Sequence, residues 1–152
     1  MAFKFPLDTL LNHRRHLEDS VVPELRAAQE ALSTEEMIRE RLCSLAAWGE
    51  SELAKHQVEG RAGWELAIFH DFLNRVRGER IRSEERLESL RSRVDLIRAD
   101  LLEKRKGRRV VEILKEKSWH TYRREEDRKE QRVLDEVAQL QFKRTRGDGH
   151  GR

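Results

Sequence analysis

The sequence is poor in the residues that interrupt helices and in those that build a thick core. Its 152 residues include one cysteine, two prolines and eight glycines, and only 37% of the residues are hydrophobic. Charged residues make up 40% of the chain, against roughly 25% in an ordinary globular domain. This composition argues against a thick globular core and favours long helices that each bury one narrow stripe.

Cysteine and long apolar runs are scarce, and this bears on the cellular compartment. The single cysteine, Cys43, allows neither an internal disulfide nor a cysteine-based zinc site. The N-terminal residues lack a continuous apolar stretch followed by a small-residue cleavage site, and no uncharged apolar run approaches the roughly 20 residues that span a bilayer. We therefore expect a cytoplasmic protein that is neither secreted nor inserted in a membrane.

The net charge of +3 is concentrated at the C-terminus, because residues 143–152 hold four basic side chains and one acidic side chain. Over residues 1–142 the two signs balance. The last ten residues are also rich in glycine, so we expect a flexible basic tail over 143–152 and a single helical hairpin over 1–142.

Apolar residues in the first third of the chain recur about every 3.5 residues, which is the heptad spacing of a left-handed coiled coil and argues against disorder. Arg14 and Glu35 are the two polar exceptions. We expect a helix over about 8–59 with Asp8 as its N-cap, and Pro23 predicts a kink just before it. The expected seam is Leu10, Arg14, Leu17, Val21, Leu25, Ala28, Leu32, Glu35, Ile38, Leu42 and Leu45.

Two glycines mark the centre of the expected hairpin, which we place at about 60–63, with a second helix over about 64–141. This helix opens with more apolar residues than one seam requires, so we expect a further contact there. An apolar stripe then continues along it. The stripe comprises Leu87, Leu90, Val94, Ile97 and Leu101, and less regularly Val110, Val111, Leu114, Trp119 and Tyr122.

The two expected helices differ in length. At about 1.5 Å per residue the first spans roughly 78 Å and the second roughly 117 Å, so the first would end opposite about residue 116 of the second. Residues from about Lys117 onward would have no intramolecular partner, although several of them are apolar. We expect an external binding surface there, and pairing in a homodimer is the alternative. The apolar residues concerned are Val133, Leu134, Val137, Leu140 and Phe142, with Phe3, Phe5, Leu10 and Leu11 near the same end.

The sequence contains none of the common catalytic motifs: no phosphate-binding loop, no nucleophile elbow and no H-E-x-x-H helix. His13 and His16 lie one turn apart but have no obvious third ligand. Acidic and basic residues alternate over 123–130, as on a solvated face with salt bridges. The basic run over 103–109 has acidic neighbours and no interleaved aromatic residues, which argues against nucleic-acid binding. We expect no enzymatic activity, no metal and no cofactor.

Three segments follow one another in a distinctive order: FKFPLDTLLNHRRHLED, LLEKRKGRRVVEILKEK and YRREEDRKEQRVLDEVAQLQF. In this order they resemble the FliJ family, the soluble coiled-coil component of the bacterial flagellar type III export apparatus. The resemblance implies a long antiparallel two-helix coiled-coil hairpin, similar to the central stalk of rotary ATPases. It also implies a protein that binds other proteins, with ATP hydrolysis belonging to a partner.

The resemblance further implies partners and contact residues. Contact with the hexameric export ATPase is implied for Phe5, Leu10, Leu11, Leu134, Val137, Leu140 and Phe142. Contact with the cytoplasmic side of the transmembrane export gate is implied for Trp64, Phe69, Phe72 and Val76. Contact with export chaperones and peripheral association with the inner-membrane export apparatus are implied as well. Intramolecular packing is the alternative for both residue groups. A stalk protein of a virulence injectisome, or an unrelated helical scaffold or nucleic-acid binder, is the alternative for the function.

Overall fold

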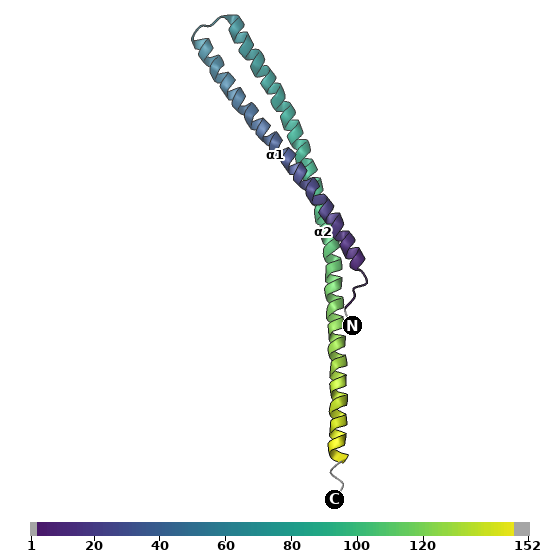
Figure 1. The fold of residues 1–152 in the computed structure, drawn as a ribbon. Coiled ribbons are helices and arrows are strands. Elements are labelled where there is room, and N and C mark those ends of the chain that lie inside the picture. Colours follow the sequence, from purple (N-terminus) through teal and green to yellow (C-terminus); the bar gives the residue numbers. More distant parts are fainter. Residues whose placement is uncertain (1–2, 148–152) are drawn as a thin grey trace. The chain divides into compact units, whose positions relative to one another are not determined.

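The computed structural model describes residues 3–147 and contains two long helices, α1 (Asp8–Val58) and α2 (Gly63–Gly147). They pack against each other in antiparallel directions, and no strand occurs within residues 3–147 (Figure 1). This confirms the predicted all-α, two-helix hairpin fold.

The helix bounds differ slightly from those expected. α1 ends at Val58 rather than 59, and it runs through Pro23 as one helix. α2 ends at Gly147 rather than at about 141, so residues 143–147 of the predicted tail are helical. The rest of that tail, residues 148–152, lies outside the described residues.

The chain forms two compact units, and both helices contribute to each. We call Leu17–Lys104 the hairpin unit. The terminal unit contains the described residues up to His16 together with those from Arg105 onward.

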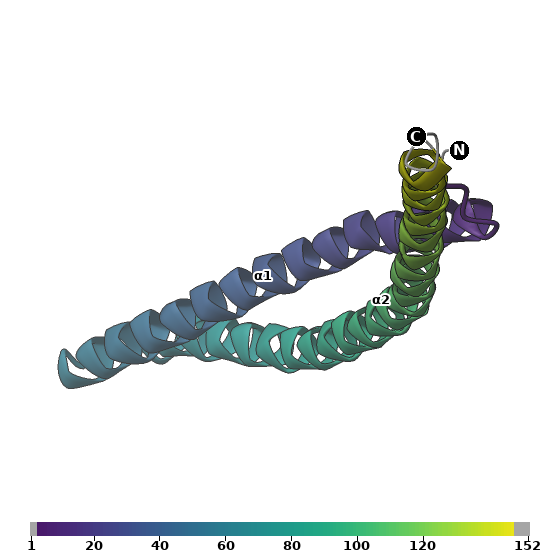
Figure 2. The same ribbon diagram turned by 90° about the horizontal axis from the view of Figure 1, so that it is seen from below.

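The connection between the two helices closes the hairpin unit, which Figure 2 shows from another side. The Arg61 amide donates to the His56 carbonyl (3.1 Å) and the Gly60 amide donates to the Gln57 carbonyl (3.2 Å). This pair of bonds is a Schellman motif, which satisfies the last carbonyls of α1. Gly60 has a φ of +67°, a left-handed conformation that favours glycine. The predicted turn therefore has its physical cause in Gly60.

The side of α1 that faces α2 follows steps of three and four residues without a break. In the middle of α1 the predicted seam is correct, with Val21, Ala28 and Glu35 all buried. Towards its two ends the seam shifts by one residue. Leu11 and Ala46 are buried where Leu10 and Leu45 were expected. At Leu17, Ile38 and Leu45 the prediction chose the larger apolar residue, whereas the regular heptad continues through Glu18, Arg39 and Ala46. Positions 10 and 11 are both leucine, so side-chain type could not decide between them. The observed seam is Leu11, Arg14, Glu18, Val21, Leu25, Ala28, Leu32, Glu35, Arg39, Leu42, Ala46, Gly49, Leu53 and His56.

On α2, the regular part of the predicted stripe is buried or half-buried in the hairpin unit. Leu87, Val94 and Leu101 are at most 6% exposed, and Leu90 and Ile97 are half-buried. In the terminal unit the less regular part divides. Val111 and Tyr122 face the inside, as does the half-buried Ser118, while exposed members of the stripe point outward. These exposed members are Val110, Leu114 and Trp119.

Gly49 allows a close approach of the two helices in the hairpin unit. A Cβ atom at this position would lie 2.8 Å from Cε1 of Phe72 and 3.0 Å from Cδ2 of Leu73. Non-bonded carbon atoms do not approach this closely, so a side chain at position 49 would push α1 away from α2. At Gly78, by contrast, a Cβ would meet nothing within 4 Å.

We therefore expect Gly49→Ala and Gly78→Ala to have opposite effects on stability. Gly78→Ala should stabilise the protein by up to about 1 kcal/mol, because alanine is the better helix former. Gly49→Ala gains the same helix propensity but introduces overpacking that costs about 1–3 kcal/mol, so it should be net destabilising. Urea denaturation followed by circular dichroism measures both variants. Equal stabilisation by the two substitutions would contradict the close approach.

Candidate functional site

The residues implied in export-gate contact lie at the start of α2 and differ widely in exposure. Trp64 is 66% exposed, whereas Val76 is 6% exposed and belongs to the core of the hairpin unit. Phe69 and Phe72 are half-buried. Only Trp64 is largely exposed, so the four residues do not form one uniform surface.

Phe69 and Phe72 instead join an aromatic cluster with residues of α1. The Trp48 ring centre lies 5.9 Å from that of Phe72, edge to face, and 6.4 Å from that of Phe69. His56 packs on Phe69 with ring centres 4.8 Å apart. Trp48 remains 54% exposed. We call Trp48, Phe69 and Phe72 the aromatic surface.

The sequence analysis did not single out Trp48. A regular heptad places Ala46 and Gly49 in the seam, and this places Trp48 at its edge, beside the aromatic residues of α2. The small residues Ala46 and Gly49, spaced as in a heptad, were the sequence feature that could have placed Trp48 at the edge of the seam.

Three residues implied in ATPase contact lie at the start of the chain, and two of them are in the core of the terminal unit. Phe5 and Leu11 are 5% and 1% exposed and pack with Val111 of α2, with Phe3 against them. Leu10 points outward and is 37% exposed. For Phe5 and Leu11 the geometry is therefore that of intramolecular packing, and Leu10 is the accessible member.

The N-terminal segment reaches further along α2 than the helix lengths suggested. The Phe3 and Tyr122 rings have centres 5.5 Å apart, and Lys115 Nζ donates to the Asp8 carboxylate at 2.6 Å. The expectation that residues from about Lys117 onward lack an intramolecular partner is thus corrected, since the contacts extend to Tyr122. The reason is that residues 3–7 precede α1 and were left out of the length comparison. Asp8 lies in the first turn of α1, where its carboxylate pairs with Lys115.

The last part of α2 carries the remaining implied ATPase contacts, and every residue over 127–143 is exposed. At 3.6 residues per turn, Val133, Leu134, Val137 and Leu140 fall within an arc of about 120°, wider than a simple heptad seam. Leu134 and Leu140 are 68% and 63% exposed. Phe142 is also exposed. We call Val133, Leu134, Val137 and Leu140 the C-terminal stripe.

Ion pairs cover much of the charged surface of the terminal unit. In the basic run, Arg108 donates to Glu112 at 2.7 Å and Arg109 donates to Glu116 at 3.1 Å. The hydrogen bond from Arg108 is the main cause that lowers the pKa of Glu112 below its ordinary value. Further along α2, Lys129 pairs with Glu126. The charged runs thus neutralise one another locally along the helix, as the alternating pattern predicted.

Within residues 3–147, no three histidine, cysteine or acidic side chains gather in a way that could hold a metal ion. His13 and His16 are both exposed. Neither helix, over its described residues, has a stretch both long and apolar enough to cross a membrane.

Comparison with known protein families matches residues 3–147, nearly the whole chain, to the family described as flagellar FliJ protein. No curated protein and no solved structure matches the chain. The family is a non-catalytic component of flagellar protein export. A match over this length, on a chain that folds as two antiparallel helices, shows that the protein belongs to the FliJ family of flagellar export proteins.

Proposed function

We propose that this chain links the hexameric export ATPase to the cytoplasmic side of the transmembrane export gate, and that it also contacts export chaperones. The chain performs no chemistry in this role, and the ATPase hydrolyses ATP. The observation that carries the proposal is the C-terminal stripe, an apolar arc that stays exposed in a member of a flagellar export family. The protein would be cytoplasmic and peripherally associated with the inner-membrane export apparatus.

The ATPase contact is assigned to the C-terminal stripe, with Leu10 and Phe142 as additional exposed apolar residues. Asp135 and Glu136 lie among the apolar positions and Arg132 precedes them. A few apolar anchors surrounded by charged residues are typical of interfaces in which a small number of side chains supply most of the affinity. Phe5 and Leu11 support this contact from within, because they hold residues 3–16 against α2.

The export-gate contact is assigned to Trp64 and the aromatic surface, both in the hairpin unit. Exposed tryptophan and half-buried phenylalanine provide large contact areas at low cost in conformational entropy. Val76 belongs to the core that supports them and is not assigned a direct contact.

The ATPase contact is tested by Leu134→Asp combined with Leu140→Asp. Two anchors of about 2 kcal/mol each together correspond to a loss of affinity of about a thousandfold. Binding of the purified full chain to the flagellar export ATPase is measured by isothermal titration calorimetry. Helicity by circular dichroism should stay unchanged, because both side chains are exposed.

The matched control is Leu96→Asp combined with Leu102→Asp. These two leucines are also exposed, lie on the same helix and have the same spacing, but belong to the hairpin unit. The control should bind the ATPase as the unmodified chain does. Unchanged binding by the Leu134/Leu140 variant would show that the C-terminal stripe is not the ATPase contact. Capture of an injectisome ATPase in preference to the flagellar one would move the function to the alternative system.

A further inference from the structure

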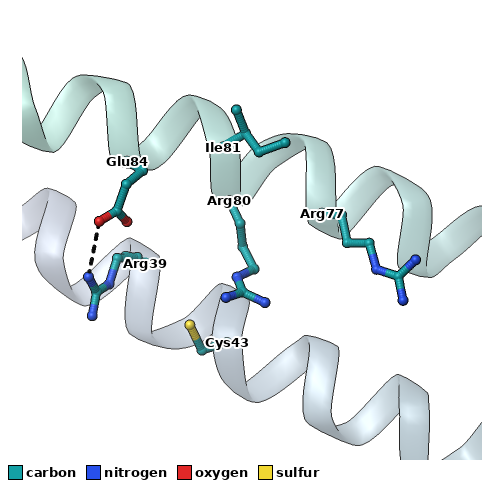
Figure 3. A pocket seen from close by; sticks show the side chains of 6 residues that line it. All are labelled: Arg39, Cys43, Arg77, Arg80, Ile81 and Glu84. Atoms are coloured by element: carbon teal, nitrogen blue, oxygen red, sulfur yellow. Dashed lines mark hydrogen bonds and ion pairs between the residues drawn. The ribbon is translucent and has the colours of Figure 1, made fainter.

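A groove in the hairpin unit is lined by three arginines. Arg39 and Cys43 come from α1, and Arg77, Arg80, Ile81 and Glu84 come from α2. Figure 3 shows Arg80 pointing across toward α1, where it ends near Cys43. Ile81 points the other way and is 64% exposed, so it forms an apolar edge.

The groove exists because the heptad seam carries arginine where an apolar layer is expected. Arg80 follows Val76 and precedes Ser83 in the seam of α2, and Arg39 lies between Glu35 and Leu42 in that of α1. Val76 and Ser83 are buried, but Arg39 and Arg80 are exposed. A guanidinium group does not fill an apolar layer, because burying its charge without an ion-pair partner costs more free energy than the packing contributes.

The charges around the groove do not balance. Arg39 donates to Glu84 at 3.4 Å, which accounts for one guanidinium and the one carboxylate of the lining. Neither Arg77 nor Arg80 has an ion pair or hydrogen bond to any residue of the part of the chain that the structure describes. The positive charges of Arg77 and Arg80, one helical turn apart, are therefore available in the groove.

We propose that this groove binds an acidic segment of a partner protein, which places carboxylates against Arg77 and Arg80. Arginine holds a carboxylate through two parallel N–H···O bonds, and the partly apolar surroundings strengthen the pair relative to open water. The patch is too short to follow a nucleic-acid backbone and has no stacking aromatic residue among its lining residues. Ile81 at its edge suits a peptide that carries an apolar side chain beside its acidic ones.

The inference is independent of the proposed function, because it uses neither the C-terminal stripe nor the aromatic surface. It adds a charge-based contact on the hairpin unit. Failure of ATPase binding would leave it intact, and its own failure would leave the ATPase contact intact.

The test uses a labelled peptide of alternating glutamate and leucine residues and the full chain, with binding followed by fluorescence anisotropy at low and physiological salt. Arg77→Gln combined with Arg80→Gln should weaken binding by about tenfold or more. The matched control is Arg75→Gln combined with Arg93→Gln, which removes the same charge from exposed positions of the same unit. The control should bind within about twofold of the unmodified chain. The single variant Arg77→Gln, at an exposed position, provides a second measurement in case the pair alters folding.

Cys43 reports directly on occupancy, because it lines the groove and is the one cysteine of the chain. The acidic peptide should slow the reaction of Cys43 with a neutral maleimide, and a peptide with glutamine in place of glutamate should not. Equal weakening by the control pair, or unchanged reactivity of Cys43 at saturating peptide, would overturn the proposal. Tighter binding of a DNA duplex that depends on Arg77 and Arg80 would also overturn it, since the occupant would then be a nucleic acid.

Discussion

Replacing Leu11 by alanine is expected to destabilise the terminal unit by about 2–5 kcal/mol, the usual cost of emptying a buried leucine site. Leu11 is 1% exposed and packs with Phe5 and Val111, so its loss would leave a cavity that the short N-terminal segment fills poorly. Hydrogen exchange measured by mass spectrometry should show faster exchange over residues 8–16. Urea denaturation gives the free energy of unfolding.

The neighbouring Leu10 is the matched control, because the two leucines are adjacent but Leu10 is 37% exposed. Leu10→Ala should cost less than about 1 kcal/mol. If Leu10 contacts the ATPase, this variant loses affinity for it without losing stability, whereas Leu11→Ala loses both. Similar destabilisation by the two substitutions would show that the burial of Leu11 is not what holds the segment.

Replacing Glu35 by alanine is expected to cost about 2 kcal/mol, because it removes the acceptor of a buried polar layer. The Ser83 hydroxyl, fully buried, donates to Glu35 Oε1 at 2.6 Å, and Arg86 Nε donates to the same oxygen at 3.0 Å. Without Glu35 the hydroxyl loses its carboxylate acceptor, while Arg86 is half-exposed and regains water. Glu84→Ala, which removes an exposed carboxylate one residue from Ser83, should change the stability by no more than about 0.5 kcal/mol.

A double replacement tests whether the stability lost in Glu35→Ala comes from the polar hydroxyl of Ser83 that stays buried. Glu35→Leu combined with Ser83→Ala leaves no buried polar atom behind and should restore most of the stability lost in Glu35→Ala, or exceed it. If the double variant were as unstable as Glu35→Ala, the lost hydrogen bonds would not be the cause.

The stabilisation from Glu35 should depend on pH in the acid range. The hydrogen bond from Ser83, aided by Arg86, lowers the pKa of Glu35 below its ordinary value of 4.5, against the opposing effect of burial. A lowered pKa means that the folded state binds the proton less readily than the unfolded state. The contribution is therefore complete above the ordinary pKa and is lost as the pH falls through the lowered value. Thermal denaturation over a pH series should show the unmodified chain and Glu35→Ala converging in acid. A constant gap at all pH values would argue against an ionised Glu35.

Much of the fold follows from local patterns. The heptad spacing predicted the helices, and the paired glycines predicted the turn, because a left-handed residue is needed where α1 ends at Val58. The seam was predicted correctly where large apolar side chains coincide with the regular heptad. It was predicted one residue off at Leu10 and Leu45, since the neighbouring Leu11 and Ala46 are the buried residues.

The candidate site divides in the same way. The exposed apolar stretch near the C-terminus was predicted from helix lengths, and Leu134 and Leu140 are indeed largely exposed. The burial of Phe5 was beyond reach because residues 3–7 have no periodic pattern, and that of Leu11 was missed because the seam was predicted one residue off. The arginine groove was missed as well, since it depends on which residues of two distant segments share a layer.

The amino-acid sequence alone determined that this protein is two long antiparallel helices joined near Gly60, and its ordered motifs pointed to the FliJ family. These are properties of local periodicity, turn chemistry and composition. The tertiary structure decided which neighbouring residues face inward, as with Leu11 against Leu10, and which side chains meet across the seam, as with Glu35 and Ser83. The physical reason is that adjacent side chains lie about 100° apart around a helix, so the rotation of the helix about its own axis decides which of two neighbours faces the core. That rotation is chosen by the packing of both helices together.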